Sequence, residues 1–160
     1  MKVLKYTAAI ALLVPALAST AAAQNGTQSV GYEVQAINQI SITGSPSLVI
    51  STATAGSAPT SVTGSGSYAI TTNQTNKKVT AQIDSNMPSG VTLSVTLAAP
   101  SGATSAGAVT LSTTPVNAVT GISTVNQSGL SVSYQLAATV AAGVVAASSR
   151  TVTLTIADGA

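Results

Sequence analysis

The side chains that could act as general acids or bases are few in this chain and lie far apart. The sequence holds three carboxylates, Glu33, Asp84 and Asp158, and contains no His and no Cys. Histidine triads, thiol nucleophiles and zinc sites with Cys or His ligands are therefore excluded. A carboxylate pair for glycoside hydrolysis would have to come from these three residues, which fall on a strand face, at a turn and near the C-terminal end. We expect no catalytic residue and no enzymatic activity.

Three short motifs admit a chemical interpretation, and each has a plainer structural one. Lys77 or Lys78 could activate a serine, but both follow an Asn-rich turn, where lysines are usually solvated. The stretch 84–86, Asp-Ser-Asn, resembles part of a calcium loop, yet calcium takes about six or more oxygen ligands, and an Asx-type turn fits better. The stretch 64–66, Gly-Ser-Gly, leads into a strand pattern and so lacks the helix N-terminus that holds phosphate. We expect a loop there, no metal ion and no cofactor.

The N-terminal residues have the layout of a secretory signal of bacterial type. Lys2 and Lys5 precede an apolar stretch at 8–18, and three alanines at 21–23 precede Gln24. The apolar stretch is shorter than the roughly 20 residues that span a bilayer as a helix. Residues 1–23 are therefore predicted to be a signal peptide, with no transmembrane anchor. The mature protein is expected to be secreted to the extracellular space or cell surface, with the periplasm left open.

Removal of the signal also removes the net positive charge. The full chain has a formal charge of +2, and Lys2 and Lys5 supply it. Nucleic-acid binding requires clustered Lys and Arg that displace counterions from phosphates. We exclude nucleic acid as a partner because the mature chain is neutral and holds no such cluster.

The segment 30–42 alternates apolar and polar residues with a period of two, which is typical of a β-strand. Ile37 and Asn38 interrupt the alternation. The segment exceeds the usual strand length of about 5 to 6 residues. It is therefore either one long strand or two strands joined at Asn38.

Similar alternation, bounded by Gly, Pro, Ser and Asn clusters, recurs along the rest of the chain. The further strands are expected at 48–50, 68–70, 79–83, 91–97, 109–111, 130–136 and 152–156. Turns are expected at 64–66, 73–76, 87–90, 100–102 and 126–129. Short strands at this spacing predict an all-β protein, an immunoglobulin-like antiparallel β-sandwich of about eight or nine strands. It forms a single domain over residues 30–160, behind a flexible mature N-terminus at 24–29. The alanine-rich stretch 136–147 is expected to be an apolar hairpin connection rather than a helix.

The scarcity of charge on these strands points to self-association. Monomeric β proteins usually protect their edge strands with charged residues or proline, because an open edge pairs with other chains. Here the polar faces carry Thr, Ser and Gln instead. The segment 30–42 would then be a donor strand that adds to the sheet of a neighbouring copy, or else the first strand of its own sandwich. The assembly residues proposed on it are Val30, Tyr32, Val34, Ala36, Ile40 and Ile42.

Four stretches resemble the secreted bacterial β-sandwich proteins of the fimbrial-subunit and spore-coat-U type. They are 34–42, 66–70 (Gly-Ser-Tyr-Ala-Ile), 88–93 (Pro-Ser-Gly-Val-Thr-Leu) and 151–156. The resemblance implies a structural subunit of an extracellular or cell-surface assembly, a pilus-like or fimbria-like filament that polymerises by β-strand addition. Other surface subunits or a chaperone would be its partners. The chain departs from that group in having neither a disulfide nor an aromatic residue near its C-terminus.

A second function stays open on the sequence. A secreted adhesive or carbohydrate-binding module would present exposed aromatic and amide side chains to its ligand. Tyr32, Gln35 and Gln39 are the candidates in this chain. Binding of glycans by the monomer would distinguish this module from a structural subunit.

Overall fold

The computed structural model describes residues 22–159. The predicted signal peptide, residues 1–23, lies outside these residues except for Ala22 and Ala23. The chain divides into two compact units, the first ending at Glu33 and the second beginning at Val34. The part described in the first unit, residues 22–33, has no regular secondary structure. Across residues 22–159 the structure contains no helix with the length and apolar character needed to cross a membrane.

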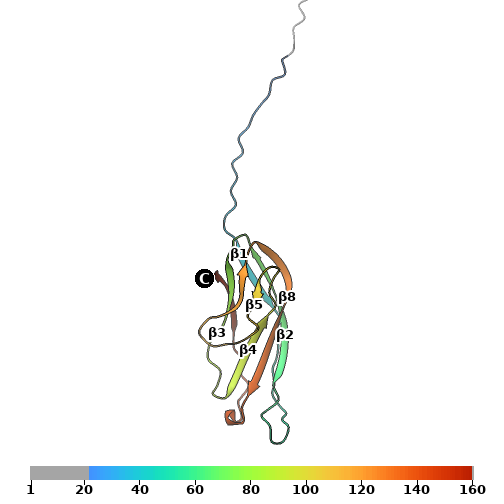
Figure 1. Cartoon of the computed structure of the whole chain (residues 1–160), viewed down its shortest axis with the longest axis vertical. Coiled ribbons are helices and arrows are strands. Elements are labelled where there is room, and N and C mark those ends of the chain that lie inside the picture. The colour runs from blue at the N-terminus through green and yellow to red at the C-terminus, as the bar shows by residue number, and fades with distance from the viewer. Residues whose placement is uncertain (1–21, 160) are drawn as a thin grey trace, which may run out of the picture. The chain divides into compact units, whose positions relative to one another are not determined.

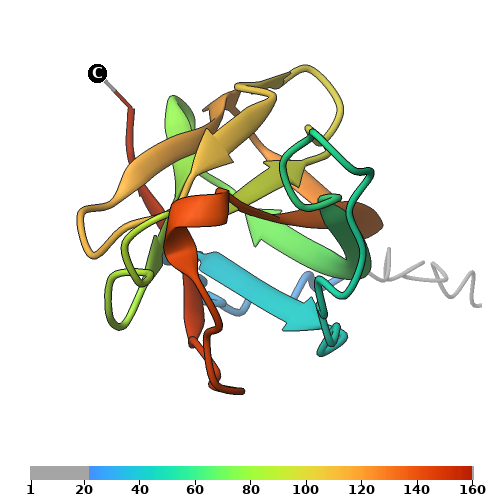
Figure 2. The ribbon, with the colours of Figure 1, turned by 90° about the horizontal axis from the view of Figure 1, so that it is seen from below.

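The second unit is an antiparallel β-sandwich of nine strands (Figures 1 and 2). One sheet has the strand order β1-β2-β8-β4-β6 and the other β5-β7-β3-β9. The all-β sandwich predicted from the sequence is therefore confirmed. The strands are β1 (Asn38–Thr43), β2 (Val62–Thr72), β3 (Lys77–Ile83), β4 (Val91–Leu97), β5 (Thr104–Ser105), β6 (Ala108–Thr110), β7 (Val116–Ile122), β8 (Val125–Ala138) and β9 (Val152–Asp158).

The core lies between the two sheets and is made by every second residue of the central strands. On β3, for example, Val79, Ala81 and Ile83 are buried, because successive side chains of a strand point to opposite faces. The same alternation buries Leu93, Val95 and Leu97 on β4. Most of the other core residues are aliphatic, so the two buried tyrosines, Tyr68 and Tyr134, are its largest side chains.

Tyr68 also supplies a polar anchor inside the core. Its hydroxyl donates a hydrogen bond to the carbonyl oxygen of Ala98, 2.5 Å away, at the end of β4. Burial raises the pKa of Tyr68 to about 12 from 10.0, because the phenolate form is poorly solvated there. The folded state therefore favours the protonated form of Tyr68.

We expect Tyr68→Phe to lower the free energy of unfolding by about 1 to 2 kcal/mol, because the Ala98 carbonyl loses its partner in a partly buried place. The raised pKa adds a pH dependence. The folded state resists ionisation, so its stability is constant below pH 10 and falls as the pH rises from 10 towards 12. Urea unfolding at a series of pH values measures both effects. A fall of the same size in Tyr68→Phe as in the unaltered protein would show that Tyr68 does not cause it.

The predicted loop at 64–66 is wrong, since these residues lie inside β2. The two glycines are needed there for close approach rather than for a turn. A Cβ at Gly64 would lie 2.6 Å from Cβ of Pro46 and 2.8 Å from a methyl carbon of Leu48, and one at Gly66 would lie 2.7 Å from the carbonyl oxygen of Thr43. The glycines thus let the chain that leaves β1 pack directly on β2.

The predicted turn at 126–129 is also wrong, because β8 continues through it. Tyr68 pairs with Leu130 and Ile70 pairs with Gln127, so β8 carries one extra residue at this point. Gly129 has a φ of +69°, which a glycine adopts without steric cost. The glycine marks a β-bulge within a strand of 14 residues.

Two further expectations about strands need correction. The stretch 48–50 is not a strand; Leu48 instead packs as part of the connection over Gly64. Strand β7 was not predicted, because Val119 follows Ala118 directly and both are buried, which breaks the period of two. The register between β3 and β7 shifts at that point.

The alanine-rich stretch 136–147 contains no α-helix, as expected. Strand β8 ends within it, and one short 3-10 turn follows at Val140–Ala142. It is not a hairpin, however, because β8 and β9 belong to different sheets. The connection carries Val140, Val144 and Val145 as exposed aliphatic side chains.

Candidate functional site

One side of the sandwich is bounded by two long edge strands, β1 and β9, which belong to different sheets. Each pairs with a single neighbour, β1 with β2 and β9 with β3. Some Cα atoms of β1 and β9 lie within 8 Å of each other, but the two strands share no ladder. On the other side, the edge strands β5 and β6 are only 2 and 3 residues long and follow each other along the chain. We call the side between β1 and β9 the open edge.

The inward side chains of the open edge are incompletely covered. On β9, Val152, Leu154 and Ile156 point towards the core but are only half-buried, whereas their neighbours across the ladder, such as Ala81 and Val79, are fully buried. On β1, Ile40 is half-buried and Ile42 is 41% exposed. Aliphatic surface therefore remains accessible along both strands.

The backbone of β9 has hydrogen-bonding groups directed towards the same side. The amide of Asp84 donates to the carbonyl of Thr151, and the amide of Gly159 donates to that of Asn76. In an antiparallel pair such bonded positions recur at every second residue, so odd-numbered residues of β9 bond to β3. The peptide groups of Val152, Leu154 and Ile156 consequently point to the open edge, where the described residues contain no strand that pairs with them.

The six predicted assembly residues do not lie on one strand. Ile40 and Ile42 belong to β1 and pair with Ile70 and Tyr68 of their own sheet. Val30, Tyr32, Val34 and Ala36 precede β1 in a stretch without regular structure. The first three are 77%, 95% and 79% exposed. The interruption at Ile37 and Asn38 thus marks the start of β1.

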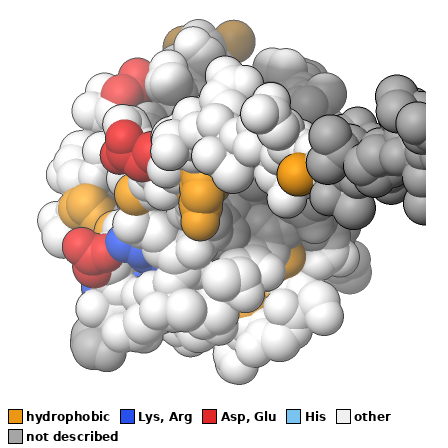
Figure 3. All heavy atoms as spheres, turned by 90° about the horizontal axis from the view of Figure 1, so that it is seen from above, with side chains coloured by type: hydrophobic (Ala, Val, Ile, Leu, Met, Phe, Trp, Pro, Cys, Tyr) orange, Lys and Arg blue, Asp and Glu red, His pale blue; other side chains and the backbone are white. Residues whose placement is uncertain are grey.

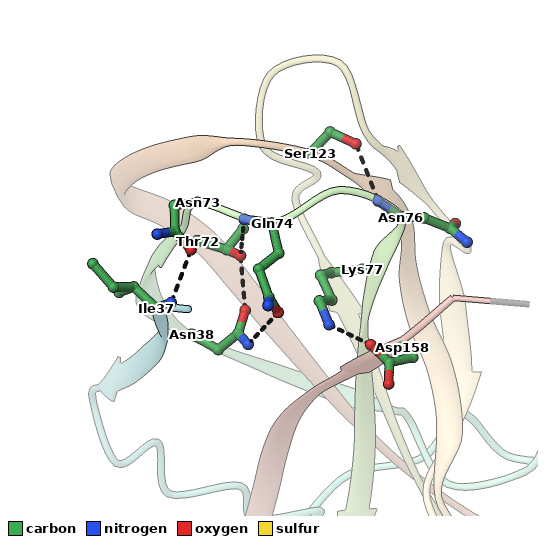
Figure 4. Close-up of polar contacts among 9 residues, drawn as sticks. All are labelled: Ile37, Asn38, Thr72, Asn73, Gln74, Asn76, Lys77, Ser123 and Asp158. Atoms are coloured by element: carbon green, nitrogen blue, oxygen red, sulfur yellow. Dashed lines mark hydrogen bonds and ion pairs between the residues drawn. The ribbon is translucent and has the colours of Figure 1, made fainter. Parts of the chain in front are cut away.

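The turn 73–76 between β2 and β3 holds the start of β1 (Figure 4). The side chain of Asn73 accepts a hydrogen bond from the amide of Ile37 (2.8 Å) and donates one to the carbonyl of Gln35 (2.8 Å). The amide of Asn73 also donates to the carbonyl of Ile37 (3.3 Å). Asn38 is held in addition by Thr72 and Gln74, whose side chains bond to its amide group.

The same turn holds the end of β9. The carbonyl of Asn76 accepts a hydrogen bond from the amide of Gly159 (2.7 Å), and the ammonium of Lys77 forms an ion pair with the carboxylate of Asp158. The hydrogen bond from Lys77, and then its charge, lower the pKa of Asp158. Asn76 has a φ of +51°, a conformation that asparagine tolerates better than most residues. One turn therefore fixes both strands of the open edge at one end.

The polar residues Asp84 and Asn86 of the stretch 84–86 have structural partners. The carboxylate of Asp84 accepts a hydrogen bond from the amide of Thr151, and the guanidinium of Arg150 donates to the carbonyl of Asn86. Within residues 22–159, no group of three or more acidic, His or Cys side chains is placed to hold a metal ion. Asp84 and Asn86 thus help to join the turn after β3 to the chain before β9.

Uncharged polar groups dominate the face of the molecule that Figure 3 shows. In Figure 3 the few charged side chains gather on one side, and most other visible atoms are backbone or uncharged polar side chains. Two shallow pockets of about 260 Å³ each lie on the sheet that contains β1, one lined by residues 39–41 and 69–71 and the other by Ala69, Thr71 and residues 126–128. Their linings offer hydroxyl and amide groups but no titratable side chain.

The second unit is thus an all-β sandwich, and its open edge is incompletely covered. Comparison of the chain with family models, curated proteins and solved structures gave no match. Sequence reasoning did not identify the uncovered edge of β9 or the contacts that turn 73–76 makes with β1 and β9. The alternation at 152–156 was visible, but half-burial of its apolar face depends on which strands lie beside it.

Proposed function

We propose that this protein is a non-enzymatic structural subunit of a secreted or cell-surface assembly, and that its copies join by β-strand addition. The observation that carries the proposal is the open edge, where unpaired peptide groups and half-buried aliphatic side chains occur together on β9. An exposed strand edge of this kind is a template for pairing with another chain. The signal-like N-terminus supports export to the site of assembly.

The complementary segment is supplied by residues 30–34 of a second copy. Val30, Tyr32 and Val34 alternate with the same period of two as Val152, Leu154 and Ile156. In extended chains both sets repeat at about 6.6 to 6.8 Å. A strand of this pattern can pair with the backbone of β9 while its three apolar side chains cover the inward face of the open edge.

Such addition requires a limited movement of β1. Neighbouring strands in a sheet lie about 4.8 Å apart, so a strand placed between β9 and β1 needs roughly 10 Å between them. Some Cα pairs of these strands are now within 8 Å. The open edge must therefore widen, and the newly buried aliphatic surface, at about 25 cal/mol per Å², drives the movement.

The test is negative-stain electron microscopy of purified residues 24–160 beside residues 35–160. The deletion stops before Gln35 because Asn73 binds that residue and because β1 is part of the sandwich. We expect ordered filaments or oligomers from the longer chain alone. Circular dichroism and cooperative unfolding should show that both chains are folded. Equal assembly by the shorter chain would contradict strand donation by residues 30–34.

A second candidate, a secreted adhesive or carbohydrate-binding module, is favoured by one observation. Tyr32 and the neutral outer faces of the strands offer an exposed ring with hydroxyl and amide groups. Folded, dispersed monomers of residues 24–160 in the same experiment would favour this candidate, and a glycan array would then test it.

A further inference from the structure

We infer that Asn73 directs the donor segment, residues 30–34, to a second copy of the chain. It does so by preventing the segment from entering the open edge of the same chain. The inference rests on the proposed function. It assigns Asn73 as a positioning residue, which sets the direction of the chain upstream of β1. Without such a device, a donor segment attached directly to β1 would have its own open edge as the nearest acceptor.

The contacts of Asn73 continue the β1–β2 ladder beyond the last residue of β2, Thr72. The backbone amide of Asn73 bonds to Ile37, as the next bonded pair of the ladder requires. Its side-chain oxygen then accepts from the amide of Ile37, and its side-chain nitrogen donates to the carbonyl of Gln35, each at 2.8 Å. The amide group thus replaces a peptide group of a longer β2, and residues 35–37 continue the line of β1.

This direction determines what the upstream residues can do within the same molecule. The open edge lies beside β1, so a chain that continues in line with β1 must reverse before it can pair with its own β9. Tight connections between antiparallel strands take about 2 to 5 residues. With Gln35 and Ile37 held, the reversal falls within residues 30–34 and places Tyr32 and Val34 in the turn. These side chains then cannot cover Val152, Leu154 and Ile156 of the same chain.

In a second copy the same segment meets no such restriction. It enters as an extended strand, and all three apolar side chains are free to face β9. If the side chain of Asn73 no longer holds Gln35 and the amide of Ile37, only the backbone bond to the Ile37 carbonyl remains, and the reversal can shift towards residues 34–37, immediately before β1. Val30 and Tyr32 would then reach the open edge of their own chain. Asn73 therefore favours assembly over closure of the monomer.

The absence of cysteine from the sequence allows a direct test by disulfide cross-linking. The mature chain carries Tyr32→Cys together with Val152→Cys, Leu154→Cys or Ile156→Cys, one pair at a time, with Asn73 either kept or changed to Ala. Laterally adjacent side chains on paired strands lie about 4.5 to 5.5 Å apart at Cβ, which is near disulfide range. Non-reducing gels then separate cross-links between chains from those within a chain.

With Asn73 present we expect cross-links between chains, seen as a ladder of multimers. Asn73→Ala should lower the ratio of between-chain to within-chain cross-links by at least about fivefold, since two hydrogen bonds that hold residues 35–37 are lost. Gln74→Ala is the matched control in the same turn. Its side chain accepts a hydrogen bond from that of Asn38, which follows the held residues 35–37, so the ratio should not change.

The cross-linking results distinguish a failure of the role of Asn73 from a failure of strand addition. Cross-links mainly within the chain while Asn73 is present would overturn the role of Asn73 and leave the open edge as the acceptor. An absence of cross-links in every pair would overturn strand addition itself. Hydrogen exchange gives a readout that does not depend on assembly: the amide of Ile37 should exchange faster in monomeric Asn73→Ala, and unchanged exchange would contradict the positioning role.

Discussion

We expect Tyr32→Asp to prevent assembly of the mature chain and to leave the sandwich folded. Tyr32 is 95% exposed in the single chain and lies outside the strands, so its replacement removes no core contact. In the proposed assembly its side chain is buried between the sheets of the next copy. A carboxylate there would lose its hydration without gaining a cationic partner, which costs several kcal/mol. The protein concentration needed for assembly should rise by at least about 100-fold.

Light scattering across a concentration series measures this effect, with electron microscopy to identify the product. Ser29→Asp is the control, because it adds the same charge directly before the donor segment, at an odd position that faces away from β9 in the proposed pairing. It should assemble like the unaltered chain. Filaments of Tyr32→Asp at an unchanged concentration would contradict burial of this side chain.

The second large effect is expected in the core. Leu97→Ala should lower the free energy of unfolding by about 2 to 5 kcal/mol, because it removes buried methyl groups and leaves a cavity in close-packed surroundings. Leu97 is fully buried at the end of β4. The free energy of unfolding of a single domain is usually only about 5 to 15 kcal/mol. The variant would therefore retain a much smaller free energy of unfolding.

Urea denaturation of residues 35–160 measures this loss. This chain lacks the donor segment, so we expect it to be monomeric and assembly not to interfere. Val144→Ala is the control, since this aliphatic side chain is fully exposed in the connection after β8. Its effect should stay within about 0.5 kcal/mol. A loss below about 1 kcal/mol for Leu97→Ala would show that the packing around β4 is not as described.

Most of the sandwich was predictable because its central strands obey a simple alternation. Residues 79–83, 91–97 and 130–136 place an apolar side chain at every second position, and each lies on a strand with that face buried. The errors occur where tertiary contacts override a local signal. Glycine at 64 and 66 predicts a turn in isolation, but it is required inside β2 by the chain that packs on it.

For the candidate site, the sequence by itself determined the alternating apolar pattern at Val30, Tyr32 and Val34, the zero formal charge of residues 24–160 and the lack of histidine and cysteine chemistry. Only the tertiary structure decided that Ile40 and Ile42 belong to the chain's own sheet, that β9 presents unpaired peptide groups, and that Asn73 holds Gln35 and Ile37. The physical reason is that alternation reports which side chains share a face of one strand. Edge position, register and coverage depend instead on residues distant in sequence, and no local pattern encodes them.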